Sequence, residues 1–474
     1  MHPLPTRPYG HAAAPRLAAP GPGCDTAAMP PNRLPRPTVR FALPLLVLLL
    51  ACLAQWTLAL NPGYFSHDEL QWGAAADVPP GMALPWFPWT DATMLQWRPL
   101  TFNAWLLLSS ALFETPRAMH ALWVLMGSSI AAGLAWLLLR MGLKARTAAM
   151  AGLLFALNPY AAYVHGWVAT LADLLWVGAS LALAAVLERA YRRGAIVPAA
   201  AWAFGLTALG LLAKEAALVM PGLVGLAWLL AGRPRVLAAA TAASALAALA
   251  YLALRAGALL SPDASSGYSL APAAAPKNFA AYAMYLPVTA SFEVNTLWLR
   301  SHGQLVASAL LMLGLALGVL RASPRLGLAL ALGAVVTVGP VLVLPQTATQ
   351  YGYGFSLWLV ACTALAWPKL GRPFRALVLL LSLLCTWHGV RVQHEMRAVG
   401  ERQAVFQPAL AQALAAHDGP LKLQRHRKFG WAYERLVHDV PSWRGQAIGD
   451  RVRWVEDAAE ADYRIADDGR LVRP

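Results

Sequence analysis

The chain has 474 residues, of which 58% are hydrophobic and only 13% are charged. Soluble proteins are about 25% charged, so this composition excludes a soluble enzyme and an intrinsically disordered protein. The net charge at pH 7 is +15. Because the basic residues lie in short clusters between apolar stretches, they do not predict nucleic-acid binding. The composition instead predicts a polytopic membrane protein.

The N-terminal segment, residues 1–38, is rich in Pro, Ala and Arg and shows no apolar periodicity. Such a segment cannot bury a core, which predicts a flexible basic leader on the cytoplasmic side. Met29 is an alternative start of the chain. The apolar run from Phe41 to Leu60 is longer than the ~7–15 residues of a cleaved signal and is long enough to span a bilayer.

Further apolar segments recur along the chain and, with the first run, predict eleven membrane spans. The ten that follow the first cover residues 118–139, 147–164, 166–187, 196–213, 216–231, 236–258, 304–320, 327–344, 353–368 and 375–390.

Basic residues mark alternate connections between these segments and thereby predict orientation. Five connections are rich in Lys and Arg, and the five that alternate with them are poor in both. Cytoplasmic loops carry the excess of Lys and Arg in membrane proteins. We therefore expect an inner-membrane protein with a cytoplasmic N-terminus and a periplasmic C-terminus. The basic connections contain Arg140, Lys144 and Arg146; Arg189, Arg192 and Arg193; Arg233 and Arg235; Arg321 and Arg325; and Lys369, Arg372 and Arg375.

Two long insertions fall on the predicted external side, at about 61–117 and 259–302. The first contains a 15-residue apolar stretch from Pro99 to Phe113. That stretch is too short to span comfortably, and counting it as a span would invert the charge alternation. It therefore predicts an interfacial helix.

The tail, residues 391–474, has 14 Lys or Arg and 12 Asp or Glu in 84 residues. A helical pattern covers roughly Val392–Ala416, and apolar residues flank Asp467-Asp468-Gly469, which is typical of a β-hairpin. We therefore expect an all-α polytopic domain over residues 39–390 followed by a small external α/β domain.

Acidic residues are scarce before the tail, and five of the eleven there lie in the first external loop. Those five are Asp68, Glu69, Asp77, Asp91 and Glu114. Asp68 and Glu69 follow the first span by a few residues, so their carboxylates are expected near the membrane surface. A carboxylate there can act as a general base on a hydroxyl group or hold a divalent cation such as Mg²⁺ or Mn²⁺. The alternative is a solvated pair that keeps the loop out of the bilayer.

Three more charged residues lie within or between predicted spans. Asp173 lies inside a span, where an ionised group costs ~2.5–3.5 kcal/mol on insertion scales, so it predicts either a function or a hydrogen bond to a neighbouring helix. Lys214 and Glu215 are sequence neighbours and cannot face each other on a helix, so separate partners are expected. Lys214 is a candidate for binding a lipid phosphate. The alternative is that both charges snorkel to the interface.

Other predicted external cations are candidates for the same phosphate. These are Arg98, Arg117, Arg255, Lys277 and Arg300. His120 and His165 lie near external helix ends, where a lone histidine is more often a polar contact than a ligand. The sequence has no Cys/His cluster with zinc spacing, no glycine-rich phosphate loop after a strand and no Gly-x-Ser-x-Gly motif.

Several short motifs occur in a distinctive order. They are Asp68-Glu69, Arg98-Pro99-Leu100-Thr101, Pro116 with His120, Asn158-Pro159, Trp167, Ala172-Asp173-Leu174-Leu175, Leu211-Leu212-Ala213-Lys214-Glu215 and Gln350-Tyr351-Gly352-Tyr353. The order of these motifs, and the side of the membrane on which they are predicted to lie, resemble those of the GT-C glycosyltransferases. It is most similar to the membrane half of tetratricopeptide-containing protein O-mannosyltransferases and their bacterial relatives, over residues 41–390.

The resemblance implies a transferase that moves a sugar from a polyprenyl-phosphate donor to an acceptor hydroxyl of a protein, lipid or envelope glycan on the external side. Asp68 would be the catalytic base, with Glu69 supporting it or a metal ion. Lys214 and Glu215 match a family pair that lines the donor-side cavity. The substrate-binding candidates are Asp91, Arg98, His120, Asp173, Lys214, Glu215, Arg255, Arg300, Gln350, Tyr351 and Tyr353.

One position departs from the family pattern. Relatives carry Arg before the late Tyr-x-Tyr motif, whereas this chain carries Gln350. Either Arg255 or Arg300 holds the donor phosphate instead, or the activity is altered or lost. Two other functions stay open: a transporter or flippase, which predicts broken helices and ionisable groups at mid-membrane, and a non-catalytic protein that binds a lipid-linked glycan or organises an envelope complex.

Overall fold

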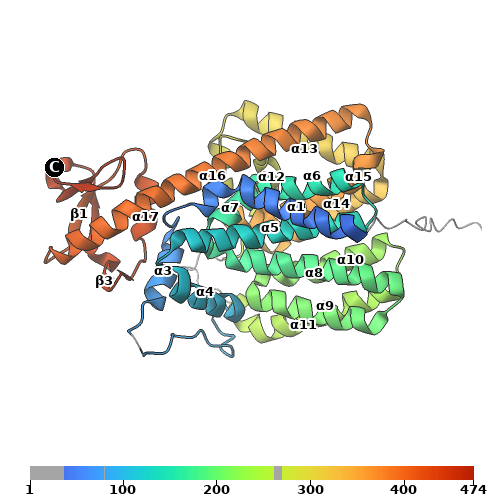
Figure 1. The fold of residues 1–474 in the computed structure, drawn as a ribbon, viewed down its shortest axis with the longest axis horizontal. Coiled ribbons are helices and arrows are strands. Elements are labelled where there is room, and N and C mark those ends of the chain that lie inside the picture. Colours follow the sequence, from blue (N-terminus) through green and yellow to red (C-terminus); the bar gives the residue numbers. More distant parts are fainter. Residues whose placement is uncertain (1–36, 80, 95, 261–268) are drawn as a thin grey trace, which may run out of the picture. The chain divides into compact units, whose positions relative to one another are not determined.

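The computed structural model describes residues 37–79, 81–94, 96–260 and 269–474, so nearly all of the predicted leader lies outside the described residues. Helices dominate the described chain (Figure 1). They are α1 (Pro37–Ala54), α2 (Trp56–Ala59), α3 (His67–Ala76), α4 (Pro99–Leu112), α5 (Pro116–Arg140), α6 (Ala145–Leu157), α7 (Pro159–Gly166), α8 (Leu171–Arg193), α9 (Ile196–Ala213), α10 (Met220–Leu230), α11 (Arg235–Leu260), α12 (Ala275–Tyr285), α13 (His302–Ala322), α14 (Pro324–Leu342), α15 (Gly352–Ala366), α16 (Arg372–Ala415) and α17 (Gly430–Val437).

Seven helices in the described part of the chain are long and apolar enough to cross a membrane, or eight if the bent pair of α6 and α7 counts as one span. These seven helices are α5, α8, α9, α11, α13, α14 and α16. These helices support the prediction of a polytopic membrane protein. The predicted number of eleven spans is not confirmed, because the other predicted segments form shorter helices. The predicted interfacial stretch is helix α4.

The bend between α6 and α7 has a local cause in Asn158 and Pro159. The two helices meet at 57°. Pro159 has no backbone N–H and cannot continue the hydrogen bonding of α6. The Asn158 side chain caps α7 by accepting from the N–H groups of Tyr160 and Ala161, at 2.9 and 3.2 Å. The apolar segment predicted at 147–164 is therefore two short helices.

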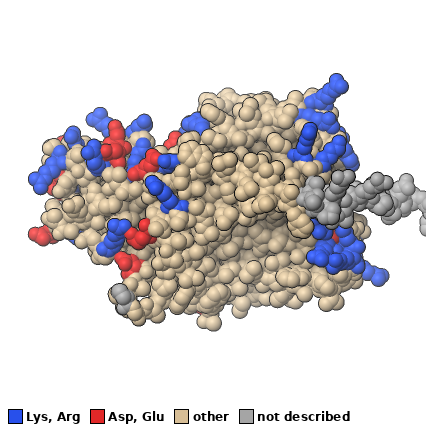
Figure 2. Space-filling view, viewed as in Figure 1, with Lys and Arg blue, Asp and Glu red and all other residues tan. Residues whose placement is uncertain are grey.

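The five basic connections lie together at one end of the helical bundle. They join α5 to α6, α8 to α9, α10 to α11, α13 to α14 and α15 to α16. Figure 2 shows blue Lys and Arg side chains gathered at that end, a broad uncharged belt, and mixed charges at the opposite end. The helices run alternately between the two ends of the bundle. Asp68, Lys214 and the C-terminal strands therefore lie at the end opposite the basic connections.

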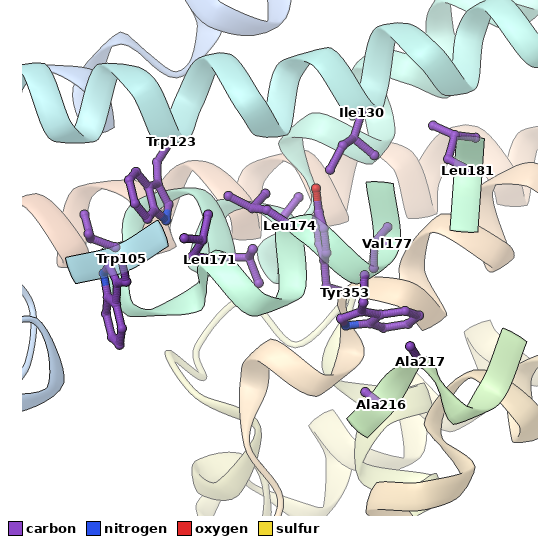
Figure 3. Close-up of a cluster of buried hydrophobic side chains, with 14 of the residues drawn as sticks. Trp105, Trp123, Ile130, Leu171, Leu174, Val177, Leu181, Ala216, Ala217 and Tyr353 are labelled. Atoms are coloured by element: carbon purple, nitrogen blue, oxygen red, sulfur yellow. The ribbon is translucent and has the colours of Figure 1, made fainter. Parts of the chain in front are cut away.

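The packed interior of the bundle forms where α4, α5, α8 and α15 meet (Figure 3). Trp123 of α5 is fully buried, and Trp105 of α4 lies nearby in the same cluster. Leu171 and Leu174 of α8 lie toward the two tryptophans, and Val177 lies further along α8, beyond Tyr353 of α15. This packing fixes the beginning of α8, which carries Asp173.

The last span continues without a break into the tail. Helix α16 is 44 residues long and includes most of the segment predicted as a separate helix, Val392–Ala416. A four-stranded sheet with the order β4-β1-β5-β6 follows. Its strands are β1 (Leu421–Gln424), β4 (Val452–Val455), β5 (Tyr463–Ile465) and β6 (Leu471–Val472), and β2 (Ser442–Trp443) pairs separately with β3 (Gln446–Ala447).

Strand β1 lies parallel to β4 and β5, while β5 and β6 are antiparallel. The antiparallel pair is the hairpin predicted around Asp467-Asp468-Gly469, and Gly469 takes a positive φ of 93° in its turn. This conformation is readily available to glycine. The small α/β character of the tail is thus present in the structure.

Candidate functional site

Asp68 lies in the first turn of α3, near the start of the long loop at about residues 61–117, the first of the two loops predicted to be external. Its side chain is 36% exposed. One carboxylate oxygen is 3.4 Å from Ser66 Oγ and the other is 3.5 Å from His67 Nε2. Both contacts are long, so the carboxylate can turn toward a group that approaches from outside.

Glu69, the neighbour of Asp68, is buried and fully engaged with backbone. Its Oε2 accepts from the N–H groups of Phe65 and Ser66, each at 2.7 Å. Its Oε1 accepts from Val168 N–H at 2.8 Å. Glu69 thus occupies the N3 position of a capping interaction on α3 and ties that helix to the 3₁₀ turn η1 (Val168–Thr170) that precedes α8.

Burial raises the pKa of Glu69 to about 8, although the three backbone N–H donors oppose the shift. At neutral pH a large share of Glu69 is therefore protonated and neutral. A neutral, buried carboxyl group is poorly suited to remove a proton from a substrate. Within the Asp68-Glu69 pair, the accessible group is Asp68.

Asp173 and Lys214 form a buried ion pair. Lys214 Nζ donates to Oδ1 and Oδ2 of Asp173, at 2.7 and 2.6 Å, and the two side chains are 5% and 2% exposed. Trp176 Nε1 also donates to Asp173 Oδ1, at 3.3 Å. Asp173 is therefore bonded to a neighbouring element, the second of the two outcomes expected from its position in a span.

Glu215 pairs with a different cation, as the helix geometry predicts. Arg98 Nε donates to Glu215 Oε2 at 2.8 Å, and Arg98 Nη2 bonds the other carboxylate oxygen. This two-point geometry is the strong form of an Arg–carboxylate contact. Arg98 is the N-cap residue of α4 and Glu215 begins the 3₁₀ helix η2 (Glu215–Val219), so the pair fastens the loop at about residues 61–117 to the bundle.

Arg255 also holds the first external loop, but through backbone carbonyls. The residue is 1% exposed, and its Nη1 donates to the carbonyl oxygens of Ala92 and Met94. Arg300 lies in the second external loop, at the end of the 3₁₀ helix η5 (Val294–Leu299). Its Nε has no hydrogen-bond partner among the described residues.

The late motif, Gln350 to Tyr353, is divided between two environments. Gln350 and Tyr351 belong to the 3₁₀ turn η6 (Thr349–Tyr351), and Lys214 Nζ lies 4.9 Å from the centre of the Tyr351 ring. This places the turn beside the Lys214–Asp173 pair. Tyr353 is fully buried, and its hydroxyl is 3.0 Å from His165 Nε2.

The start of α8 links the Asp68 turn to the buried Lys214–Asp173 pair. Val168 binds Glu69 through its backbone, and Asp173 lies five residues further along the chain. At the rise of a helix this is about 8 Å along the axis. Thr101 Oγ1 donates to Ala213 O at 2.8 Å, which joins α4 to the end of α9 just before Lys214.

Two of the predicted substrate-binding residues, Asp91 and His120, make local contacts in the structure. Asp91 is exposed and bonds Thr93, two residues away. His120 is fully buried, with Nε2 2.8 Å from Gly63 O. It supports the backbone that leads into the Asp68 turn and is closed to solvent.

The donor set around Asp68 does not fit a tightly held divalent cation. Both oxygens of Glu69 are occupied by backbone N–H groups. Within the described ranges, no cluster of three or more His, Cys, Asp and Glu side chains is arranged to hold a metal ion.

Sequence reasoning missed a group formed by Glu293, Arg435 and Tyr163. Arg435 Nη1 and Tyr163 Oη both donate to Glu293 Oε1, at 2.9 and 2.6 Å. Glu293 could have been singled out from the sequence, because acidic residues are rare before residue 391. Arg435 could not have been singled out, because it is one of many arginines in a tail of mixed charge.

Comparisons with known proteins add no assignment. No model of a known protein family matches the chain, and no curated protein sequence matches it.

Proposed function

We propose that the chain is a membrane glycosyltransferase that moves a sugar from a polyprenyl-phosphate donor to a hydroxyl group of a protein, lipid or envelope glycan. In this proposal the site faces the periplasm of the inner membrane. The observation that carries it is the partly exposed Asp68 carboxylate, held at the same end of the bundle as the buried Lys214–Asp173 pair and the partly buried Arg98–Glu215 pair. The order of motifs that resembles GT-C enzymes supports the same assignment.

The chemistry needs few groups. Asp68 accepts the proton of the acceptor hydroxyl as its oxygen attacks the anomeric carbon, and the polyprenyl phosphate leaves with the bonding electrons. In this proposal Lys214, with Tyr351 beside it, and Arg98 are the cations for the departing phosphate, and each exchanges a bond to its carboxylate partner, Asp173 or Glu215, for one to a phosphate oxygen. Glu69 holds the Asp68 turn in place through its backbone contacts.

The proposal is tested with purified protein in lipid vesicles, a panel of radiolabelled polyprenyl-phosphate hexoses, and envelope extract as the acceptor. Wild-type protein transfers label from one of these donors, whereas Asp68→Asn loses at least about 100-fold of that rate. Asp77→Asn is the matched control, because Asp77 is an exposed acid at the other end of α3. Unchanged transfer by Asp68→Asn removes Asp68 from the mechanism. Mass spectrometry of envelope glycolipids and glycoproteins from a deletion strain identifies the acceptor.

A transporter or flippase is a second candidate, favoured by the 57° break between α6 and α7 and by the buried Lys214–Asp173 pair. Broken helices and buried charges are typical of transport sites. The same vesicles separate the two functions. A flippase changes the leaflet in which the labelled donor is found and leaves the sugar on its phosphate, whereas a transferase moves the sugar to the acceptor.

A further inference from the structure

Arg435 of α17 is the point at which the C-terminal segment contacts the turn that carries Asp68. Its Nη1 donates to Glu293 Oε1 at 2.9 Å, so its edge binds the second external loop. Its Cζ atom lies 4.3 Å from the centre of the Phe65 ring and 5.1 Å from that of Trp167. A guanidinium group can do both at once because its planar edge donates hydrogen bonds while its face stacks on aromatic rings.

The two aromatic residues that Arg435 contacts are bonded to the same turn as Glu69. Phe65 N–H is one of the donors to Glu69, and Trp167 Nε1 donates to Ser66 Oγ at 2.9 Å. Phe65 and Trp167 also pack edge to face, with their ring centres 5.8 Å apart. Movement of Arg435 would therefore release the turn from residue 65 to residue 69.

Other contacts show that the C-terminal segment covers the same helix. Gln71 Nε2 donates to Asp439 O at 2.9 Å, and the rings of His67 and His438 meet at 5.3 Å. Further along the loop, Trp443 packs against Phe113, with 5.7 Å between ring centres. These contacts lie on α3 or near the end of α4, so the tail docks on the acidic loop itself.

We propose that Arg435 is a positioning residue: by docking the C-terminal domain on Phe65, Trp167 and Glu293, it fixes the turn that presents Asp68. The transfer site is then formed jointly by the membrane bundle and the tail. This inference rests on the proposed function for its catalytic consequence, while the docking itself can be measured without any substrate.

The first measurement is hydrogen exchange of the full-length protein in detergent. In Arg435→Ala the amides of Phe65 and Ser66 exchange about tenfold faster than in wild type. Amides of β1 do not change, which shows that the tail is still folded. Arg425→Ala is the matched control, because Arg425 lies in the same domain but pairs with the exposed Glu434 and Glu456. Equal exchange of the Phe65 and Ser66 amides in wild type and Arg435→Ala overturns the proposal.

The second measurement separates positioning from simple charge pairing. Arg435→Lys keeps a cation for Glu293, but its compact ammonium group cannot bond Glu293 and contact both Phe65 and Trp167 at the same time, as the larger planar guanidinium does. We expect fast exchange at Phe65 to persist and kcat of sugar transfer from the radiolabelled polyprenyl-phosphate hexose to fall, with the donor KM unchanged. Full rescue of exchange and kcat by Lys contradicts the positioning role. If wild-type protein transfers no sugar but Arg435→Ala still loosens the turn, the docking stands and the proposed function fails.

Discussion

Lys214 Nζ lies 2.6 Å from Asp173 Oδ2, and the Lys214 side chain is 5% exposed and that of Asp173 2% exposed. Neither charge is therefore solvated, and each depends on the other. Lys214 also lies over the Tyr351 ring, whose turn includes Gln350. The pair thus holds together the beginning of α8, the end of α9 and the turn before α15.

Removing one member of this pair is expected to destabilise the protein strongly. Asp173→Asn or Lys214→Met leaves a buried charge without its counter-ion, which costs about 3–5 kcal/mol. The double variant Asp173→Asn with Lys214→Met leaves no uncompensated charge and is expected to be more stable than either single variant. Thermal unfolding in detergent measures all three. Additive losses in the double variant would show that the two charges are not coupled.

Gly389 allows α16 to pass close to the bend between α6 and α7. A Cβ atom at this position would overlap with Leu157 O and would lie 3.0 Å from the carbonyl carbon of Asn158. Because these are backbone atoms, they cannot turn away as a flexible side chain does. We expect Gly389→Ala to lower the free energy of unfolding by about 1–3 kcal/mol. Gly303→Ala is the control, since a Cβ atom there would have no neighbour within 4 Å among the described residues. Equal stability of the two variants would contradict the close packing.

The pKa of Glu69 predicts a pH dependence for the Asp68 turn. Burial raises this pKa from 4.5 to about 8 in the folded protein. A carboxyl group with a raised folded pKa stabilises the folded state most below its unfolded pKa, and the contribution is lost as pH rises through the folded pKa. Protection of the Phe65 and Ser66 amides, corrected for intrinsic exchange, should therefore decline between about pH 5 and pH 8. In Glu69→Gln the corrected protection should not vary with pH, and a flat wild-type profile would contradict the prediction.

Local sequence signals predicted much of the fold, because they depend on neighbouring residues. The apolar segment at 196–213 coincides with α9, and the Asp467-Asp468-Gly469 turn forms the expected hairpin. The predicted spans are not confirmed as continuous helices where a polar residue or a proline interrupts an apolar run. The first run breaks at Gln55, whose side chain bonds Ser128 and His165, and the segment at 147–164 bends at Pro159.

Pairing between residues distant in the chain could not be predicted from the sequence. Helix geometry predicted that Lys214 and Glu215 have separate partners but did not identify them, since Asp173 and Arg98 lie 41 and 117 residues away. The contact between Arg435 and Glu293 spans 142 residues. Asp68 and Glu69 are also chemically similar neighbours, and only the Ser66-x-x-Glu69 spacing of a capping box, which the sequence prediction did not use, distinguishes them. The structure separates them by burial, since only Asp68 is accessible.

Gln350 offers a direct test of the proposed donor site, because the resemblance to GT-C enzymes in the sequence leads us to expect Arg at this position. It is half-buried in the same short turn as Tyr351, which Lys214 contacts. If the donor phosphate binds there, Gln350→Arg adds a charge-assisted hydrogen bond and should lower the donor KM about tenfold. Gln350→Met removes the amide without adding charge and should leave the donor KM unchanged or higher. Both are measured by label transfer from the polyprenyl-phosphate hexose that wild-type protein uses. The same KM in the Arg and Met variants would mean that the phosphate binds elsewhere, and Arg300 would then be the next cation to replace.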